Sequence, residues 1–265
     1  MSRSAVMPQS SIPQGATQSE ASAEAAAREY FGDDYYGRDR FRKYLEYFPG
    51  DGPILDYGCG DGVFLNLLRS AGRVGKGIDY DRENVERGRQ FGLDIEHADL
   101  LEFADRQEEW GKYDGIMMAD FVEHFDPYPL QNLIRASLPL LSPKGTMVMI
   151  TPNSRSVLMN LGGFYEATIE HHNLYSVAGL AKFLQHEGME IVAGGVDPDS
   201  RSPIASLNPG KFARNLAIWG LGRILCGRDC LYEASFVVAQ KSPQVDQQRG
   251  RFRTAATSTA DVPTG

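Results

Sequence analysis

The sequence predicts an α/β protein built on one doubly wound sheet, mostly parallel, with helices on both faces. Short apolar runs alternate with amphipathic stretches between residues 53 and 239, a pattern typical of parallel strands joined by crossover helices. The chain has 265 residues, of which 42% are hydrophobic, enough for one sizeable core. In addition, three glycines at alternate positions follow the first apolar run, as in a strand-to-helix turn that approaches a ligand.

The predicted elements follow one another along this stretch. The strands contain short apolar runs, and the helices have apolar residues three and four positions apart. Strands are expected at 53–57, 74–79, 93–97, 113–118, 146–151, 190–194 and 233–239, and helices at 62–71, 82–91, 130–141 and 176–187. Ligands of such a sheet bind beyond the carboxyl ends of the strands, where the strand order reverses.

The composition limits the domain organisation and the partners. Residues 1–24 and 242–265 are rich in polar and small residues and lack apolar periodicity. They are expected to be a disordered leader and tail around a domain at 25–241. The net charge of −8 argues against a nucleic-acid partner, which needs a clustered basic surface. No apolar run approaches a membrane span or a signal-peptide core, and three cysteines make no disulfide framework. A cytoplasmic location is expected.

The strongest local signal is the segment 54–62, an apolar strand that leads into Gly58, Gly60 and Gly62. Glycine permits a positive φ and lets the backbone come close to a ligand. The N–H groups at the start of the following helix supply hydrogen-bond donors. A simple turn would need one glycine, so this loop is predicted to bind a ligand.

The spacing distinguishes between two classes of cofactor. It is G-x-G-x-G, and Val63 stands where the dinucleotide pattern requires glycine. Asp61 would repel a diphosphate at the helix start, so a cationic sulfonium ligand is favoured over NAD. Asp79 follows Gly62 by 17 residues and ends a predicted strand. A carboxylate there can accept hydrogen bonds from both ribose hydroxyls of an adenosine.

These residues resemble the first two motifs of the class I methyltransferases that use S-adenosylmethionine (SAM). The resemblance implies a Rossmann-like sheet with an antiparallel last strand, and SAM as cofactor. It places Asp99 and Leu100 beside the adenine, and the segment 120–124 beside the methionine part. The cofactor-binding residues it implies are Asp56, Gly58, Cys59, Gly60, Gly62, Asp79, Tyr80, Asp99, Leu100, Asp120 and Phe121.

The segment His172-x-x-Tyr175-Ser176 resembles the small-molecule and glycan branch of that family, which includes relatives of the ubiquinone-pathway O-methyltransferases. A hydroxyl acceptor benefits from a general base, and histidine is the usual one near neutral pH. His124, His171 and His172 are the candidates. Each of them has a structural alternative, as a packing or surface residue.

No metal ligands are assigned, although a metal site is an alternative. Asp120, Glu123 and His124 would share one face if their segment is helical. The ubiquinone-pathway relatives have an acidic-x-x-Glu-His pattern here that can hold a divalent ion, with Glu where this chain has Asp120. Cys226 and Cys230 lack nearby ligands to complete a zinc site.

Two segments, near 154–170 and 200–229, exceed the minimal fold and are expected to cap the ligand site. The second mixes basic and apolar residues, so it is compatible with contact with a membrane surface or a lipid-linked substrate, as well as with ordinary cap or dimer packing. The aromatic residues ahead of the first strand are expected to add a pocket wall. They are Tyr30, Phe31, Tyr35 and Tyr36.

The sequence therefore predicts an enzyme that transfers a methyl group from SAM to an oxygen or nitrogen of a small molecule or glycan. Two alternatives stay open: a SAM-binding partner protein without catalysis, and a nicotinamide-dependent oxidoreductase on a similar sheet. Nucleic-acid methylation is disfavoured by the charge. It is also disfavoured because 119–122 lack the Asn/Asp-Pro-Pro-Tyr/Phe motif after the fourth strand. The oligomeric state is not predicted.

Overall fold

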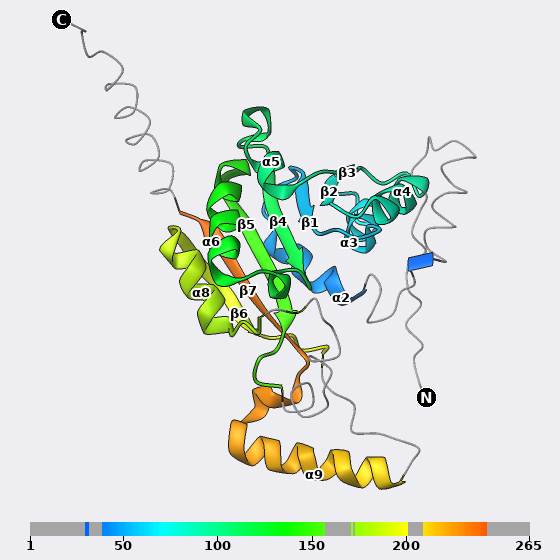
Figure 1. The fold of residues 1–265 in the computed structure, drawn as a ribbon, viewed down its shortest axis with the longest axis vertical. Coiled ribbons are helices and arrows are strands. Elements are labelled where there is room, and N and C mark those ends of the chain that lie inside the picture. Colours follow the sequence, from blue (N-terminus) through cyan, green and yellow to red (C-terminus); the bar gives the residue numbers. More distant parts are fainter. Residues whose placement is uncertain (1–29, 32–38, 157–170, 172, 201–208, 243–265) are drawn as a thin grey trace, which may run out of the picture.

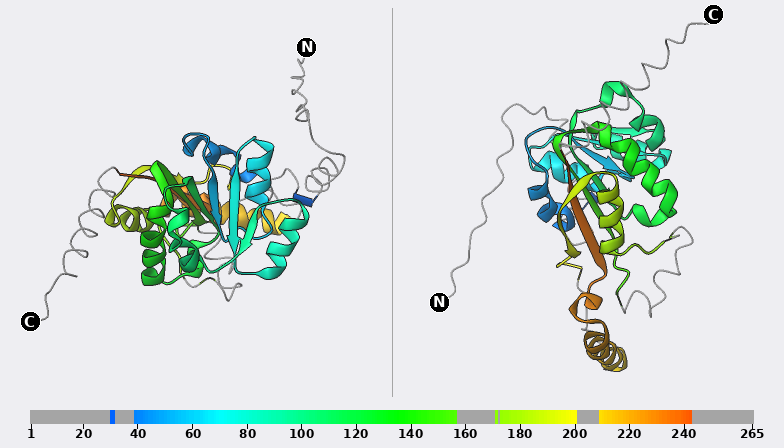
Figure 2. Two further views of the ribbon diagram at one scale, coloured as in Figure 1. Left: turned by 90° about the horizontal axis from the view of Figure 1, so that it is seen from above. Right: turned by 90° about the vertical axis from the view of Figure 1, so that its left-hand side faces the viewer.

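A computed structural model describes residues 30–31, 39–156, 171, 173–200 and 209–242. One seven-stranded sheet has the order β3-β2-β1-β4-β5-β7-β6, with helices on both faces (Figure 1, Figure 2). The strands are β1 Ile54–Tyr57, β2 Gly75–Asp79, β3 Ile95–His97, β4 Tyr113–Ala119, β5 Leu141–Pro152, β6 Met189–Val196 and β7 Ala234–Lys241. The predicted doubly wound fold is confirmed.

The directions of the strands position the site. Strands β1 to β5 pair in parallel, and β7 is antiparallel to both β5 and β6. The last strand is therefore antiparallel, as expected. The chain runs outward from β1 to β3 and returns to β4 on the other side of β1. The strand order thus reverses between β1 and β4, where such sheets bind their ligands.

The helices agree with the predicted ones in order and differ at their ends. The α-helices are α2 Asp39–Arg42, α3 Val63–Ser70, α4 Arg82–Gln90, α5 Leu100–Ala104, α6 Pro127–Ser137, α8 Val177–His186 and α9 Pro209–Cys226. The 3-10 turns are η1 Lys43–Tyr47, η2 Gln107–Glu109, η3 Val122–His124, η4 Leu138–Leu140 and η5 Arg228–Leu231. Helix α4 begins where Asp81 accepts a hydrogen bond from Glu83 N at 2.8 Å, a favourable N-cap.

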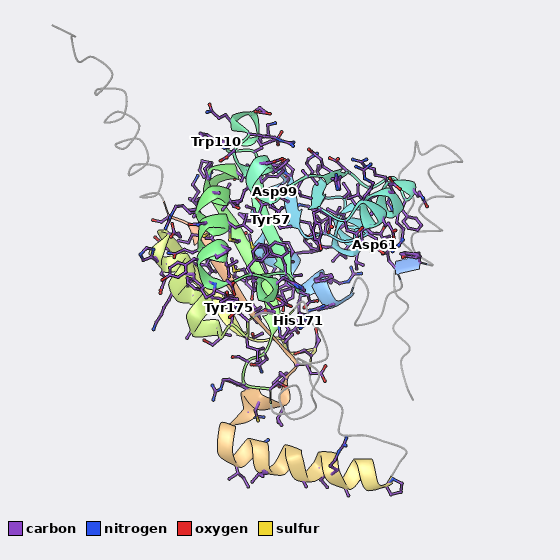
Figure 3. All side chains as sticks on the ribbon, viewed as in Figure 1. Tyr57, Asp61, Asp99, Trp110, His171 and Tyr175 are labelled. Carbon is purple, nitrogen blue, oxygen red and sulfur yellow. The ribbon has the colours of Figure 1, made fainter. Side chains whose placement is uncertain are left out.

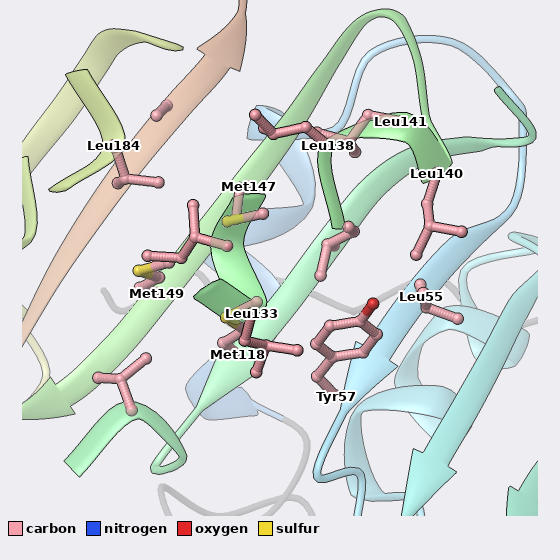
Figure 4. Packing of buried hydrophobic residues seen from close by; sticks show 14 of the residues in the cluster. Leu55, Tyr57, Met118, Leu133, Leu138, Leu140, Leu141, Met147, Met149 and Leu184 are labelled. Carbon is pink, nitrogen blue, oxygen red and sulfur yellow. The ribbon is translucent and has the colours of Figure 1, made fainter. Parts of the chain in front are cut away.

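A hydrophobic core lies on each face of the sheet. Leu133 of α6 packs among buried residues of β4 and β5, including Met118 and Met149 (Figure 4). On the other face, Phe64 and Leu67 of α3 belong to a second buried cluster. Burying one such side chain contributes about 1.5–3 kcal/mol, so the two layers fix the strand ends that carry the site.

One predicted helix extends too far toward the C-terminus. The helix expected over 130–141 ends at Ser137, and Leu141 begins β5. Pro139 has no N–H to continue the hydrogen bonds of the helix, so the chain makes the short turn η4 instead. Leu141 then pairs with Tyr113 of β4.

Several predictions fall on residues outside the described ones: the leader 1–24, Tyr35, Tyr36, most of the cap segment 154–170, His172 and most of the tail 242–265. None of the described helices is long and apolar enough to cross a bilayer. The second cap segment contains α9.

Candidate functional site

The glycine loop after β1 adopts the left-handed backbone that its sequence predicts. The φ angles of Gly58, Gly60 and Gly62 are 63°, 54° and 97°. A Cβ at Gly58 would lie 2.4 Å from the Phe121 ring, and one at Gly62 would lie 2.5 Å from Leu93. At Gly60 the same position meets open space. Two glycines therefore allow close packing, and the third leaves room in front of the backbone for a ligand.

Asp79 joins this loop to the end of β2. Its Oδ2 accepts a hydrogen bond from Gly60 N at 2.7 Å, and its Oδ1 accepts one from Asp81 N at 2.8 Å. The residue is 7% exposed. Each carboxylate oxygen can accept more than one hydrogen bond, so Asp79 keeps capacity for a pair of hydroxyl groups.

Asp56 lies in β1, two residues before Gly58, and is buried, with 4% of its surface exposed. Burial, and secondarily the charge of Asp79, raises the pKa of the Asp56 carboxyl well above its usual range. Cys59 packs beneath the loop, where a Cβ at Gly77 would lie 2.5 Å from its sulfur. Asp56 and Cys59 are thus both buried next to the glycine loop.

Asp61 differs from its expected role. Its Oδ2 accepts a hydrogen bond from the Tyr30 hydroxyl at 3.0 Å and lies 3.7 Å from Nη1 of Arg87. Because Arg87 compensates part of its charge, Asp61 repels a diphosphate less than an unpaired carboxylate would. Tyr30 and Phe31 both pack on the Phe91 ring, so they form a wall beside α4.

The residues expected around an adenine lie at the ends of β2 and β3. Tyr80 follows Asp79 and is 83% exposed. Asp99 caps α5, because its Oδ1 accepts hydrogen bonds from Leu101 N at 2.8 Å and Glu102 N at 3.1 Å. Leu100, beside it, is partly buried against the core. Asp99 therefore has a role in the fold whether or not it contacts a ligand.

Arg40 is a candidate site residue that the sequence analysis missed. It lies on α2 and forms a two-pronged ion pair with Asp120 at the end of β4, with Nη2 donating to Oδ1 at 2.7 Å. Asp120 has a left-handed backbone, φ 48°. The next residue, Phe121, packs on Phe125, with the two ring centroids 4.8 Å apart. Eighty residues separate Arg40 from Asp120, so no local pattern connects them.

The helix that would place Asp120, Glu123 and His124 on one face does not form. Only Val122–His124 make a 3-10 turn, and Asp120 precedes it in left-handed backbone and pairs with Arg40. A different group gathers here: one potential ligand atom each of Glu123, His124 and His171 lies within 4.8 Å of the others. The rings of His124 and His171 meet edge to face at 5.1 Å.

Glu123 is fully buried beside these two imidazoles. Its Oε2 accepts a hydrogen bond from the Thr151 hydroxyl at 2.9 Å. Its Oε1 is buried and has no hydrogen-bond partner among the described residues. Burial, and then the charge of Asp120, raises the pKa of Glu123 to about 8, so the carboxyl is mostly protonated at neutral pH.

The segment after β5 brings His171 to this position. Asn173 N donates to Glu123 O at 3.1 Å, and the Tyr175 hydroxyl donates to Phe125 O at 2.8 Å. Figure 3 places His171 toward the carboxyl ends of the strands, and Trp110 at the opposite end of the sheet. The exits of β4 and β5 thus share one edge with the glycine loop.

The residues at this edge fit SAM. Asp79 offers acceptors for ribose hydroxyls, and the backbone at Gly60 faces open space. Arg40 is a cation suited to the carboxylate of the methionine part.

Comparison with known proteins identifies the family. A family model described as a methyltransferase domain matches residues 27–193. This is more than half of the 265 residues. The chain belongs to this methyltransferase family.

The relatives agree with that assignment. This methyltransferase is 26% identical over 152 residues to a ubiquinone biosynthesis O-methyltransferase of Burkholderia pseudomallei, covering 52% of the chain and 65% of the relative. It is 28% identical over 120 residues to the protein of the same description from Shewanella, covering 44% and 48% respectively. The match thus spans less than two thirds of these relatives' own lengths.

A solved SAM-dependent methyltransferase from Archaeoglobus fulgidus has the same fold. It aligns with a TM-score of 0.62 at 23% identity, over 82% of this methyltransferase and 99% of that protein. The predictions of a class I SAM-dependent methyltransferase and of SAM as its cofactor are confirmed at the level of the family. The roles of the individual site residues and the domain bounds remain predictions.

Proposed function

We propose that the protein transfers the methyl group of SAM to a hydroxyl group of a small molecule. The observation that carries the proposal is the contact of His124 and His171 at the same sheet edge as Gly60 and Asp79. This edge therefore carries both a candidate proton acceptor and a candidate cofactor-binding site. The named O-methyltransferase relatives support an oxygen acceptor over a nitrogen one.

SAM, when bound, supplies a methyl carbon that its sulfonium makes electrophilic. Asp79 accepts hydrogen bonds from its ribose, Arg40 holds its carboxylate, and the Gly60 backbone leaves room for it. Holding reactants in line and away from water is the main task in such a transfer, worth roughly 7–11 kcal/mol for well-oriented groups.

The proton of the acceptor hydroxyl goes to an imidazole nitrogen of His171, with His124 packed against that ring. His172 is the neighbouring candidate and lies outside the described residues. Glu123 is a neutral donor or acceptor beneath the pair near pH 7, because its pKa is about 8. A positioned general base contributes about 10²- to 10⁴-fold in rate.

The test is turnover with a panel of hydroxyl and amine acceptors, with release of S-adenosylhomocysteine measured. The proposal expects product with a hydroxyl acceptor, and a loss of about 10²-fold or more in kcat for His171→Ala at unchanged affinity for SAM. The same loss in His172→Ala alone would move the base by one residue. SAM binding without turnover on any acceptor would favour the non-catalytic partner protein.

A divalent ion is a second candidate at this place, favoured by the grouping of Glu123, His124 and His171. One carboxylate and two imidazoles suit a transition-metal ion, and Glu123 would lose its proton on binding. Addition of the metal should then raise the melting temperature of the wild type and leave the melting temperature of the Glu123→Gln variant unchanged. No shift in either protein would exclude this candidate.

A further inference from the structure

Helix α9 stands apart from the sheet in Figure 1 and in the right-hand view of Figure 2. The described element that it chiefly contacts is the short turn η5. Large apolar side chains are exposed along the helix: Phe212 at 42%, Leu216 at 47%, Leu221 at 58% and Ile224 at 81%. Among the described residues, α9 is thus an apolar helix with little protein around it.

The exposed apolar side chains do not form one stripe. Phe212 and Leu221 are nine residues apart, which is about two and a half helical turns, so they point to opposite sides of the axis. A flat protein partner would cover one side of the helix only. A helix that sinks below the headgroups can place apolar side chains from more than one side among acyl chains, while its long basic side chains extend to water.

The charge of α9 contrasts with that of the whole chain. The helix contains Lys211, Arg214 and Arg223 and has no Asp or Glu, whereas the protein carries a net charge of −8. Arg214 and Arg223 are exposed. Arginine pairs well with phosphate oxygens, and basic residues near anionic lipid add to binding.

We propose that α9 lies in the interfacial region of an anionic phospholipid bilayer. Its apolar side chains enter the boundary between headgroups and acyl chains, and its guanidinium groups reach lipid phosphates. This goes beyond the methyl-transfer function and does not depend on it.

The attachment of α9 decides which part of the protein would face the lipid. Asn153, directly after β5, donates from Nδ2 to Asp229 O at 2.8 Å and to Tyr232 O at 2.9 Å. These bonds fix η5, and with it the C-terminal end of α9, to the edge of the sheet that carries the candidate site. In Figure 3, α9 lies beyond His171 at that edge. Bilayer-bound α9 therefore keeps the site edge close to the membrane surface.

The test is flotation of the full chain with vesicles of phosphatidylcholine alone or mixed with phosphatidylglycerol. The proposal expects binding to the mixed vesicles, weaker at high salt. Leu221→Glu and Ile224→Glu should each weaken binding by about tenfold, and the double variant Arg214→Glu with Arg223→Glu should remove the preference for anionic lipid. Matched controls at the opposite sheet edge, Val74→Glu and Lys144→Glu, should bind as the wild type does.

Three results would overturn the proposal. They are no binding of the wild type to either vesicle, equal loss in the control variants, and a dimer in ultracentrifugation that Leu221→Glu dissociates. The last result would assign α9 to a second copy of the chain. All these variants change exposed side chains, so they should melt as the wild type does and keep its affinity for SAM. That readout separates a failure of this proposal from a failure of the proposed function.

Discussion

The main-chain N–H of Gly60 donates a 2.7 Å hydrogen bond to Oδ2 of Asp79, 19 residues further along the chain. It connects the loop after β1 to the end of the neighbouring strand β2. The carboxylate is thereby held beside the open space in front of Gly60. One interaction thus shapes the backbone of the proposed cofactor site and presents its acidic group.

Removing that carboxylate should weaken the cofactor complex. Asp79→Ala is expected to lower the affinity for SAM by about 1.5–3 kcal/mol, the usual contribution of hydrogen bonds to a charged group, or about 10- to 150-fold in Kd. Calorimetry below the melting temperature of the variant measures it. Asp81→Asn is the control, because it removes a nearby charge and keeps a good N-cap. An unchanged Kd in folded Asp79→Ala would remove Asp79 from the site.

A methyl group at Gly60 should fill ligand space without a clash inside the protein. Gly60→Ala and Gly72→Ala share a positive φ, 54° and 70°, and open space at the Cβ position. Both should lose a similar stability, about 1–2 kcal/mol. Only Gly60→Ala should lose affinity for SAM, because Gly72 lies in the turn before β2, away from the site. Equal affinities of the two variants for SAM would contradict the claim that SAM occupies the space in front of Gly60.

Arg40 is expected to hold the carboxylate of the methionine part. Arg40→Gln should raise the Kd of S-adenosylhomocysteine by about tenfold or more and leave that of adenosine, which has no carboxylate, unchanged. Arg42→Gln, exposed on the same helix, should change neither value. If Arg40→Gln weakened both ligands equally, Arg40 would act on the shape of the pocket instead.

Burial of Glu123 should make stability depend on pH. Its pKa is raised from 4.5 to about 8, so the folded protein retains a proton that the unfolded chain releases between those values. The free energy of unfolding should therefore fall as pH rises from about 4.5 to about 8, by at most about 1.4 kcal/mol per unit, and then level off. The Glu123→Gln variant should lack this part of the pH dependence of the free energy of unfolding.

Urea unfolding of both proteins in the presence of a metal chelator measures the difference. Asp56, whose pKa is raised in the same direction, is present in both and cancels from the comparison. Curves that stay parallel across the whole range would show that Glu123 ionises normally in the folded protein.

The parts of the site that are close in sequence could be predicted from it. The strand, the glycine loop and helix α3 form one continuous pattern, and Asp79 ends the next strand. The period of the apolar residues and the spacing of the glycines are therefore sufficient to predict this part of the site. Leu141 lies in β5 and not in the predicted helix, because an apolar residue fits the end of a helix and the start of a strand equally well. Only the break at Pro139 separates the two.

The contacts between distant segments could not be predicted. Arg40 meets Asp120 because α2 packs near the exit of β4, and nothing in either local sequence encodes that contact. The grouping of Glu123 with His171 likewise depends on hydrogen bonds from Asn173 and Tyr175 to the backbone around η3. The sequence pattern around a charged or imidazole side chain does not indicate its distant partner, so these contacts can be identified only in the folded structure.

Calorimetric titration of the purified protein with SAM, S-adenosylhomocysteine and NADH tests the central claim most directly. The account predicts binding of the two adenosyl ligands in the micromolar range and no binding of NADH. Binding of NADH alone, or of none of the three, would contradict the assignment of the glycine loop and Asp79 to a SAM site.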